Sequence, residues 1–112
     1  MPNIFTSFKK GENEFSEIEE NLFFMKEARL ARIKSFGQVS KEGFWYEQKE
    51  DEWGMVLAGE GEIEWVDGRK KLLHAGDYIF LPALQKHRVS YTSKQPPCIW
   101  LAIYGEIKET EK

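Results

Sequence analysis

The sequence predicts an all-β fold, a barrel or a sandwich built from short strands. From Trp45 onward, apolar or alternating runs recur at intervals of about 8–12 residues, with turn residues between them. The pair Asp67-Gly68, which separates two such runs, is a strong signal for a tight β-hairpin. Strands and helices do not alternate along the chain, which argues against a parallel sheet.

The chain is long enough for one domain. It has 112 residues, of which 41% are hydrophobic and 31% charged, so the composition is that of a globular protein. We expect three parts: an N-terminal helix and edge strand packed on the barrel (1–37), the barrel itself (38–105) and a charged, frayed tail (106–112).

The N-terminal part predicts a short helix followed by a strand. Residues 16–19, Ser-Glu-Ile-Glu, have the pattern of a capping box, and Ile18, Leu22 and Met25 then recur at helical spacing. Residues 28–36 alternate between apolar and basic side chains. This alternation indicates an edge strand whose lysines and arginines discourage unwanted pairing.

The barrel strands follow in order, each ended by turn residues. The first of them, 52–58, is apolar and ends at Gly59. The next two flank the Asp67-Gly68 hairpin, and Pro82 ends the fourth. The expected strands cover residues 52–58, 62–66, 70–73, 78–81, 87–92 and 99–104.

Charge and hydropathy exclude two classes of partner. The formal net charge is -3, and the short basic run 69–71 sits beside a hairpin turn, so nothing indicates nucleic-acid binding. No apolar run approaches the roughly 18 residues that span a bilayer, and the N-terminus shows no secretion signal. We therefore expect a soluble cytoplasmic protein. The single cysteine, Cys98, lies in an apolar run and is expected to be a buried structural thiol.

Glu52 is a candidate site residue because of the face that it occupies. Strand alternation places it on the same side as Gly54, Val56 and Ala58, and if that side lines the interior, Glu52 is buried. A buried carboxylate needs a partner, since burying an unpaired charge is costly. A metal ion or an internal cation would supply one.

His87 is the second candidate. It begins a strand and shares a face with Val89 and Tyr91 by strict alternation. A lone histidine on an apolar face is more often a satisfied core residue than a ligand. The other histidine, His74, stands in a turn and is expected to be exposed.

Two spacings link these residues to a known family. Gly76, Pro82 and His87 follow the order Gly, five residues, Pro, four residues, His, while Glu52 and Gly59 are separated by six residues. In these spacings the segment 38–105 resembles the cupin family. The resemblance implies a double-stranded β-helix (a cupin or jelly-roll barrel) with a small-molecule ligand inside, and it implies a homodimer.

The chain departs from the family pattern at four positions. Leu84 and Tyr91 stand where the family has Gly and Asn, and Tyr46 and Gln48 stand where it has a histidine pair. The string 43–48, Gly-Phe-Trp-Tyr-Glu-Gln, is similar to a subgroup of small bacterial cupins of unassigned function in which the Gln position recurs.

The resemblance implies a site built from Gln48, Glu52 and His87. An amide oxygen, a carboxylate and an imidazole suit Mn, Fe, Mg, Ni or Zn, so this trio is the candidate metal site. In a metal-free pocket, Glu52 and His87 would instead pair with each other. No organic cofactor is expected. The residues expected to line the ligand pocket are Tyr46, Phe80, Tyr91 and Trp100.

Three functions remain open at this point. With Glu52 and His87 as catalytic residues, the protein would be a metal-dependent oxidoreductase or isomerase acting on a small polar or anionic metabolite. The alternative is a metal-free module that binds or senses a ligand within a frame of aromatic rings, including Trp45 and Trp53. A third role is purely structural, as a symmetric dimer formed by sheet packing.

Overall fold

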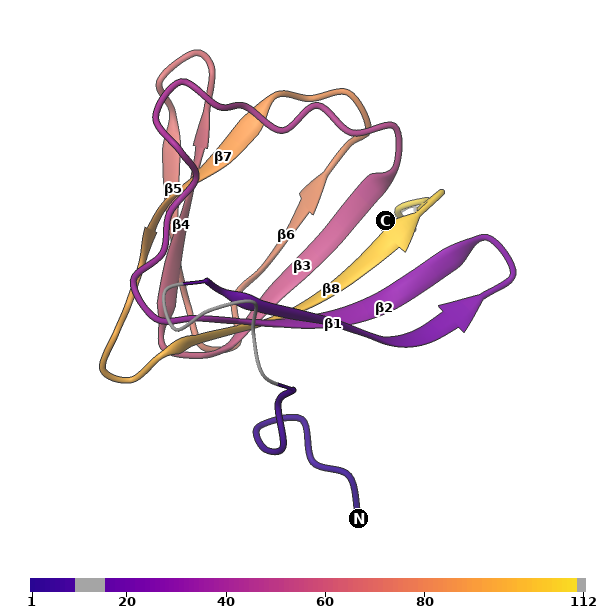
Figure 1. The fold of residues 1–112 in the computed structure, drawn as a ribbon. Helices are drawn as coiled ribbons and strands as arrows, with labels where there is room; N and C mark the ends of the chain where they lie inside the picture. The colour runs from indigo at the N-terminus through magenta and orange to yellow at the C-terminus, as the bar shows by residue number, and fades with distance from the viewer. Residues whose placement is uncertain (10–15, 111–112) are drawn as a thin grey trace.

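The described part of the chain forms eight antiparallel strands in two facing sheets (Figure 1). This computed structural model describes residues 1–9 and 16–110. The strands are β1 (Ile18–Met25), β2 (Ala28–Ser35), β3 (Asp51–Ala58), β4 (Glu60–Trp65), β5 (Lys70–His74), β6 (Tyr78–Leu81), β7 (His87–Thr92) and β8 (Cys98–Gly105). Since no helix occurs in these ranges, they contain none that could cross a membrane.

The two sheets form the expected all-β jelly-roll barrel. One sheet has five strands in the order β1-β2-β8-β3-β6, and the other has three in the order β5-β4-β7. Strand β3 leads directly into β4 through Gly59, whose φ of 71° places it in the left-handed region. An added Cβ there would lie 2.4 Å from the Pro97 carbonyl oxygen, so this turn needs glycine.

The expected N-terminal helix is wrong: the segment is strand β1. It pairs with β2 in register from Ile18 opposite Lys34 to Met25 opposite Ala28, with one irregularity between Asn21 and Phe23. At the start of β1, half-buried and exposed residues alternate, which is the period of a strand. The helical spacing was misleading because backbone bonds to a neighbouring strand decide the conformation of a short segment.

The predicted strand at 28–36 exists as β2, but it is an internal strand. Strand β1 pairs on one side of it and β8 on the other, so the sheet edge is β1. Its arginines serve the fold instead of protecting an edge. Arg32 is only 6% exposed and points away from the barrel interior, with its guanidinium 4.0 Å from the centre of the Phe8 ring.

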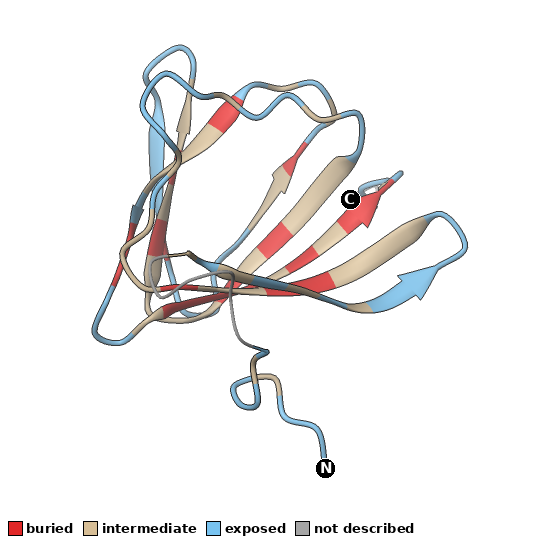
Figure 2. Cartoon of the chain, viewed as in Figure 1, coloured by how far each residue is buried: buried red, intermediate tan, exposed pale blue. Residues whose placement is uncertain are grey.

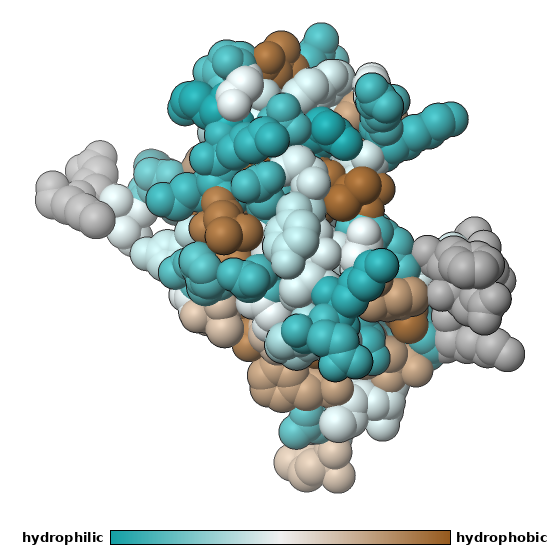
Figure 3. Space-filling view, turned by 90° about the vertical axis from the view of Figure 1, so that its left-hand side faces the viewer, coloured by the Kyte–Doolittle hydropathy of each residue, from teal (hydrophilic) through white to brown (hydrophobic). Residues whose placement is uncertain are grey.

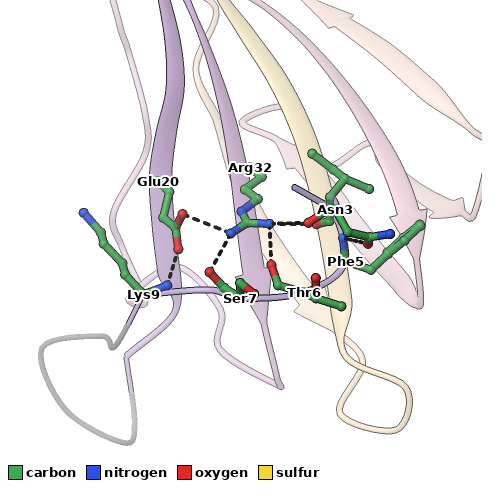
Figure 4. Close-up of polar contacts among 8 residues, drawn as sticks. Asn3, Phe5, Thr6, Ser7, Lys9, Glu20 and Arg32 are labelled. Atoms are coloured by element: carbon green, nitrogen blue, oxygen red, sulfur yellow. Dashed lines mark hydrogen bonds and ion pairs between the residues drawn. The ribbon is translucent and has the colours of Figure 1, made fainter. Parts of the chain in front are cut away.

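Arg32 fastens the N-terminal segment to the outside of the sheet (Figure 4). Its guanidinium also forms an ion pair of 3.1 Å with Glu20 on β1, and the Glu20 carboxylate accepts a hydrogen bond from the Lys9 amide. One buried cation therefore contacts five residues of otherwise irregular chain, between Asn3 and Phe8. Its guanidinium donates to the backbone carbonyls of Asn3, Ile4, Thr6 and Ser7.

The core lies where the two sheets approach each other (Figure 2). Gly61 on β4 allows close packing of the two sheets, because an added Cβ would lie 2.1 Å from the Trp100 ring. Cys98 is fully buried beside it, as expected. The buried cluster consists of Val56, Ile63, Leu73, Leu81, Cys98 and Trp100.

Candidate functional site

A cavity of about 90 Å³ lies between the sheets. It opens into a groove of about 850 Å³, since Glu17, Glu19, Tyr46 and Val89 line both spaces. The cavity wall is formed by Glu17, Glu19, Ile33, Tyr46, Gln48, Glu52, Gly54, Ile63, His87, Val89, Trp100, Ala102 and Tyr104. Residues from before β1, from six strands and from the loop ahead of β3 therefore meet at one place.

Glu52 stands on the inner face of β3, paired in register with Tyr104 of β8. Its side chain is 17% exposed, and Gln48 Nε2 donates a hydrogen bond of 3.1 Å to its Oε1 atom. Burial raises the pKa of Glu52 from 4.5 to about 7; the bond from Gln48 opposes this shift, and the charge of Glu19 reinforces it. Glu52 is therefore a carboxylic acid that changes protonation near neutral pH.

His87 faces Glu52 from the first position of β7. Its side chain is 5% exposed, and its Nδ1 atom lies 3.0 Å from the Gln85 carbonyl oxygen. Since a carbonyl only accepts, Nδ1 carries the proton and Nε2 presents a lone pair. That Nε2 lies 3.9 Å from Glu52 Oε1. Burial lowers the pKa of His87, which favours the neutral ring.

Tyr46 covers the imidazole from the loop that precedes β3. The backbones of Tyr46 and His87 exchange two hydrogen bonds, of 2.7 and 3.1 Å. This bridge holds the two rings stacked, with centroids 5.7 Å apart and planes at 24°. The same loop is anchored again two residues after Tyr46, where the Gln48 carbonyl accepts a hydrogen bond of 2.8 Å from the Leu84 amide. Backbone contacts therefore position both Tyr46 and Gln48.

The structure brings together most, but not all, of the side chains selected from sequence. Gln48, Glu52 and His87 meet in the cavity, and Tyr46 and Trp100 line it. The remaining two expected pocket residues, Phe80 and Tyr91, lie outside the lining, as does Trp53.

Phe80 and Tyr91 point away from the cavity for different reasons. Phe80 pairs with Trp53 on the outer face of the five-stranded sheet, while Ile79 and Leu81 face inward. Tyr91 follows an irregularity in the pairing of β7 with β4, which interrupts the alternation that starts at His87. It is 42% exposed.

Among the lining residues that the sequence did not predict are three with titratable side chains: Glu17, Glu19 and Tyr104. Both glutamates belong to the pattern that predicts a helix cap. In the structure, half-buried and exposed residues alternate from Ile18 onward, as in a strand. Glu17 accepts a bond of 3.1 Å from the Ser35 hydroxyl, and burial raises its pKa. Burial likewise raises the pKa of Tyr104.

The donor atoms do not fit a resident divalent metal. Among the residues that the structure describes, no three His, Cys, Asp or Glu side chains lie close enough together to hold one. The trio contributes one imidazole and one carboxylate, and the amide of Gln48 turns its NH₂ group toward Glu52. Protein metal sites normally use three or more such ligands. What the arrangement does offer is an acid and a base side by side.

Comparisons with known proteins agree with this architecture. The family model described as "Cupin domain" matches residues 37–104. A solved structure named as a putative mannose-6-phosphate isomerase from Ralstonia eutropha JMP134 is 34% identical, with a TM-score of 0.84 over 96% of this chain and 98% of that one. No curated protein sequence matches the chain.

Two more distant structures share the fold. KdgF from Halomonas sp. is 16% identical, with a TM-score of 0.72 over 96% of this chain and 94% of that one. A cupin superfamily protein from Desulfitobacterium hafniense DCB-2 is 18% identical, with a TM-score of 0.68 over 88% of this chain and 84% of that one. From the family match over most of its length and its 34% identical relative, this chain belongs to the cupin family.

Proposed function

We propose that this cupin binds a small polar molecule in the barrel cavity and that Glu52 and His87 transfer protons on it. The observation that carries the proposal is the pair of atoms Glu52 Oε1 and His87 Nε2, 3.9 Å apart at the cavity wall. A single ligand atom can lie within about 3 Å of both, because the two atoms are closer than twice a hydrogen-bond length.

The protonation states suit opposite roles. Near pH 7, Glu52 is present in both protonated and ionised forms, since burial places its pKa at about 7. His87 is neutral and offers a lone pair at Nε2, because its Nδ1 proton is held by Gln85. An isomerisation that moves a proton from one carbon or oxygen to another requires a protein acid and a protein base that contact neighbouring atoms of the ligand.

The first experiment separates catalysis from binding alone. Small hydroxy-carbonyl compounds would be incubated with the protein in D₂O, and exchange of carbon-bound hydrogen followed by proton NMR. We expect exchange that Glu52→Gln and His87→Gln each reduce by about 10²–10⁴-fold. Tyr91→Phe is the control, because this ring lies outside the cavity. Binding without exchange would leave a ligand-binding or sensing module.

A metal-dependent oxidoreductase or isomerase is the second candidate, supported by the meeting of Gln48, Glu52 and His87 at one wall. It requires further ligands that this trio does not supply. Elemental analysis of protein purified without chelator decides between the two. Stoichiometric Mn, Fe, Ni or Zn that is lost in His87→Gln would replace the proton-transfer proposal with the metal-dependent one.

We further propose that two copies associate through the outer face of the five-stranded sheet. An apolar row crosses this face in register and includes Phe23, which is 66% exposed. The opposite side of the molecule, over β5-β4-β7, is mainly hydrophilic (Figure 3). The row consists of Phe23, Leu30, Ile103, Trp53 and Phe80. Exposed apolar patches of this kind are typical of protein interfaces.

Light scattering tests the association. We expect a dimer mass for the wild-type protein and a shift toward monomer in Phe23→Ser. Tyr91→Ser removes an exposed aromatic ring from the other sheet and should leave the mass unchanged. A wild-type protein that is monomeric at about 100 μM would contradict the proposal.

A further inference from the structure

Three carboxylates surround the cavity. Glu52 stands on its inner wall, and Glu17 and Glu19 stand where it opens into the groove. Glu19 faces inward because it lies opposite Ile33, another lining residue, in the pairing of β1 with β2. The charge of Glu19 raises the pKa of both other carboxyl groups, so Glu19 repels each of them.

No basic side chain stands on the described cavity wall to neutralise this negative charge. The lining residues that the structure describes include neither lysine nor arginine. Arg29 stands beside the cavity, opposite Tyr104, and its charge partly offsets the rise in the pKa of Glu52. Its guanidinium is held by other groups, since it stacks 3.9 Å from the centre of the Tyr104 ring and donates a bond of 2.8 Å to Asn21. Lys9 lines the outer groove but not the cavity. An additional negative charge placed in the cavity would therefore be repelled by whichever of the three carboxylates are ionised.

The rest of the wall suits a positively charged guest. Tyr46, Trp100 and Tyr104 also line the cavity, and aromatic rings attract cations. The buried His87 directs Nε2 toward Glu52 at 3.9 Å, which is beyond hydrogen-bond length, so this atom is ready to accept a bond from an N–H donor. Carboxylate, ring face and lone pair are all complementary to an ammonium group.

We infer that the ligand carries a positive charge, in the form of a small organic ammonium group, and that sugar phosphates and other anions are excluded. This inference rests on the proposed function, since it takes the cavity to be the ligand site. The substrate class therefore differs from the one that the name of the 34% identical relative suggests. A sugar phosphate would need a cation on the wall to bind its phosphate group.

An organic cation fits better than a metal ion. A divalent metal requires several ligand atoms around one point, and within the described ranges no three acidic, histidine or cysteine side chains meet in this way. Glu17, Glu19 and Glu52 are instead distributed around the space. An ammonium group with its alkyl chain can be stabilised by dispersed carboxylates and ring faces together.

The experiment compares probes that differ in charge but have a common skeleton. Propylammonium, 1-propanol and propanoate would be titrated into the ¹⁵N-labelled full chain at pH 7.5 and low salt. The Gly54 amide, at the cavity wall, reports binding. We expect propylammonium to bind at least tenfold more tightly than 1-propanol, and propanoate more weakly than both. Mannosamine, mannose and mannose 6-phosphate form a second series with the same expected order.

Paired charge variants locate the effect. Glu17→Gln with Glu19→Gln removes two charges at the cavity mouth and should weaken propylammonium binding by tenfold or more. Glu27→Gln with Glu106→Gln removes two exposed charges that line neither space and should change it less than twofold. Circular dichroism without probe confirms that both variants are folded.

Three results would overturn the inference: tighter binding of the anion or the neutral probe, no binding of the cation, or equal weakening by both variant pairs. The proposed function fails separately. If 1-propanol or mannose binds, and Glu52→Gln abolishes that binding, the cavity is still the ligand site and only the charge assignment is wrong. If no probe of any charge affects Gly54, both fail.

Discussion

Glu52→Gln should stabilise the protein relative to the wild type as the pH rises. Burial raises the pKa of Glu52 from its ordinary value of 4.5 to about 7. Between these pH values the folded state keeps a proton that the unfolded state releases, so wild-type stability falls as the pH rises and remains reduced above 7. The difference between the two pKa values lowers the free energy of unfolding by on the order of 3 kcal/mol, since each pKa unit corresponds to about 1.36 kcal/mol. Glutamine has no proton to lose.

Urea unfolding at pH 4, 5.5, 7 and 8 measures this difference. The free energy of unfolding of Glu52→Gln minus that of wild type should rise with pH by on the order of 3 kcal/mol between pH 4 and 8. Glu42→Gln, which changes an exposed carboxylate, should show no such rise. A difference that stays constant from pH 4 to pH 8 would refute the assignment of Glu52 as a buried acid.

Three further outcomes follow from the fold. Burial raises the pKa of Cys98 to about 12, so the thiol of the native protein should resist maleimide at pH 8 and react once the protein is unfolded in urea. Reaction of the native protein at the rate of a free thiol would contradict this. Gly61→Ala should cost about 1–3 kcal/mol in urea unfolding, because the new methyl group meets the Trp100 ring, and an unchanged midpoint would show that the ring moves freely. Arg32→Met should lower the free energy of unfolding by about 3 kcal/mol, because it leaves Glu20 without its cation. It should also expose the N-terminal segment to proteolysis, and equal protease resistance in both proteins would rule out the fastening role of Arg32.

The acid–base pair and the surrounding carboxylates are two parts of one electrostatic arrangement. Each further negative charge near Glu52 makes its ionised form less favourable, which keeps it available as a proton donor near neutral pH. A cationic ligand would reverse this effect by favouring the ionised form. Ligand binding and the protonation of Glu52 are thus expected to be coupled.

The sequence by itself determined the fold class and the inner position of Glu52 and His87. Period-two alternation fixes which side of a regular strand a residue occupies, and turn residues such as Gly59 and Asp67-Gly68 fix where strands end. Both signals are local, so they can be read without coordinates. The spacing of Glu52 and His87 in the two motifs added the family, and the family match over residues 37–104 confirms it.

Only the tertiary structure decided which other side chains reach the cavity. Glu17 and Glu19 line the same cavity as Glu52 because β1 pairs with β2, and that pairing also replaced the expected helix with a strand. Tyr91 turns outward at a pairing irregularity that depends on β4. The physical reason is common to these cases: backbone hydrogen bonds to a strand distant in sequence set conformation and register, and no local pattern encodes the partner.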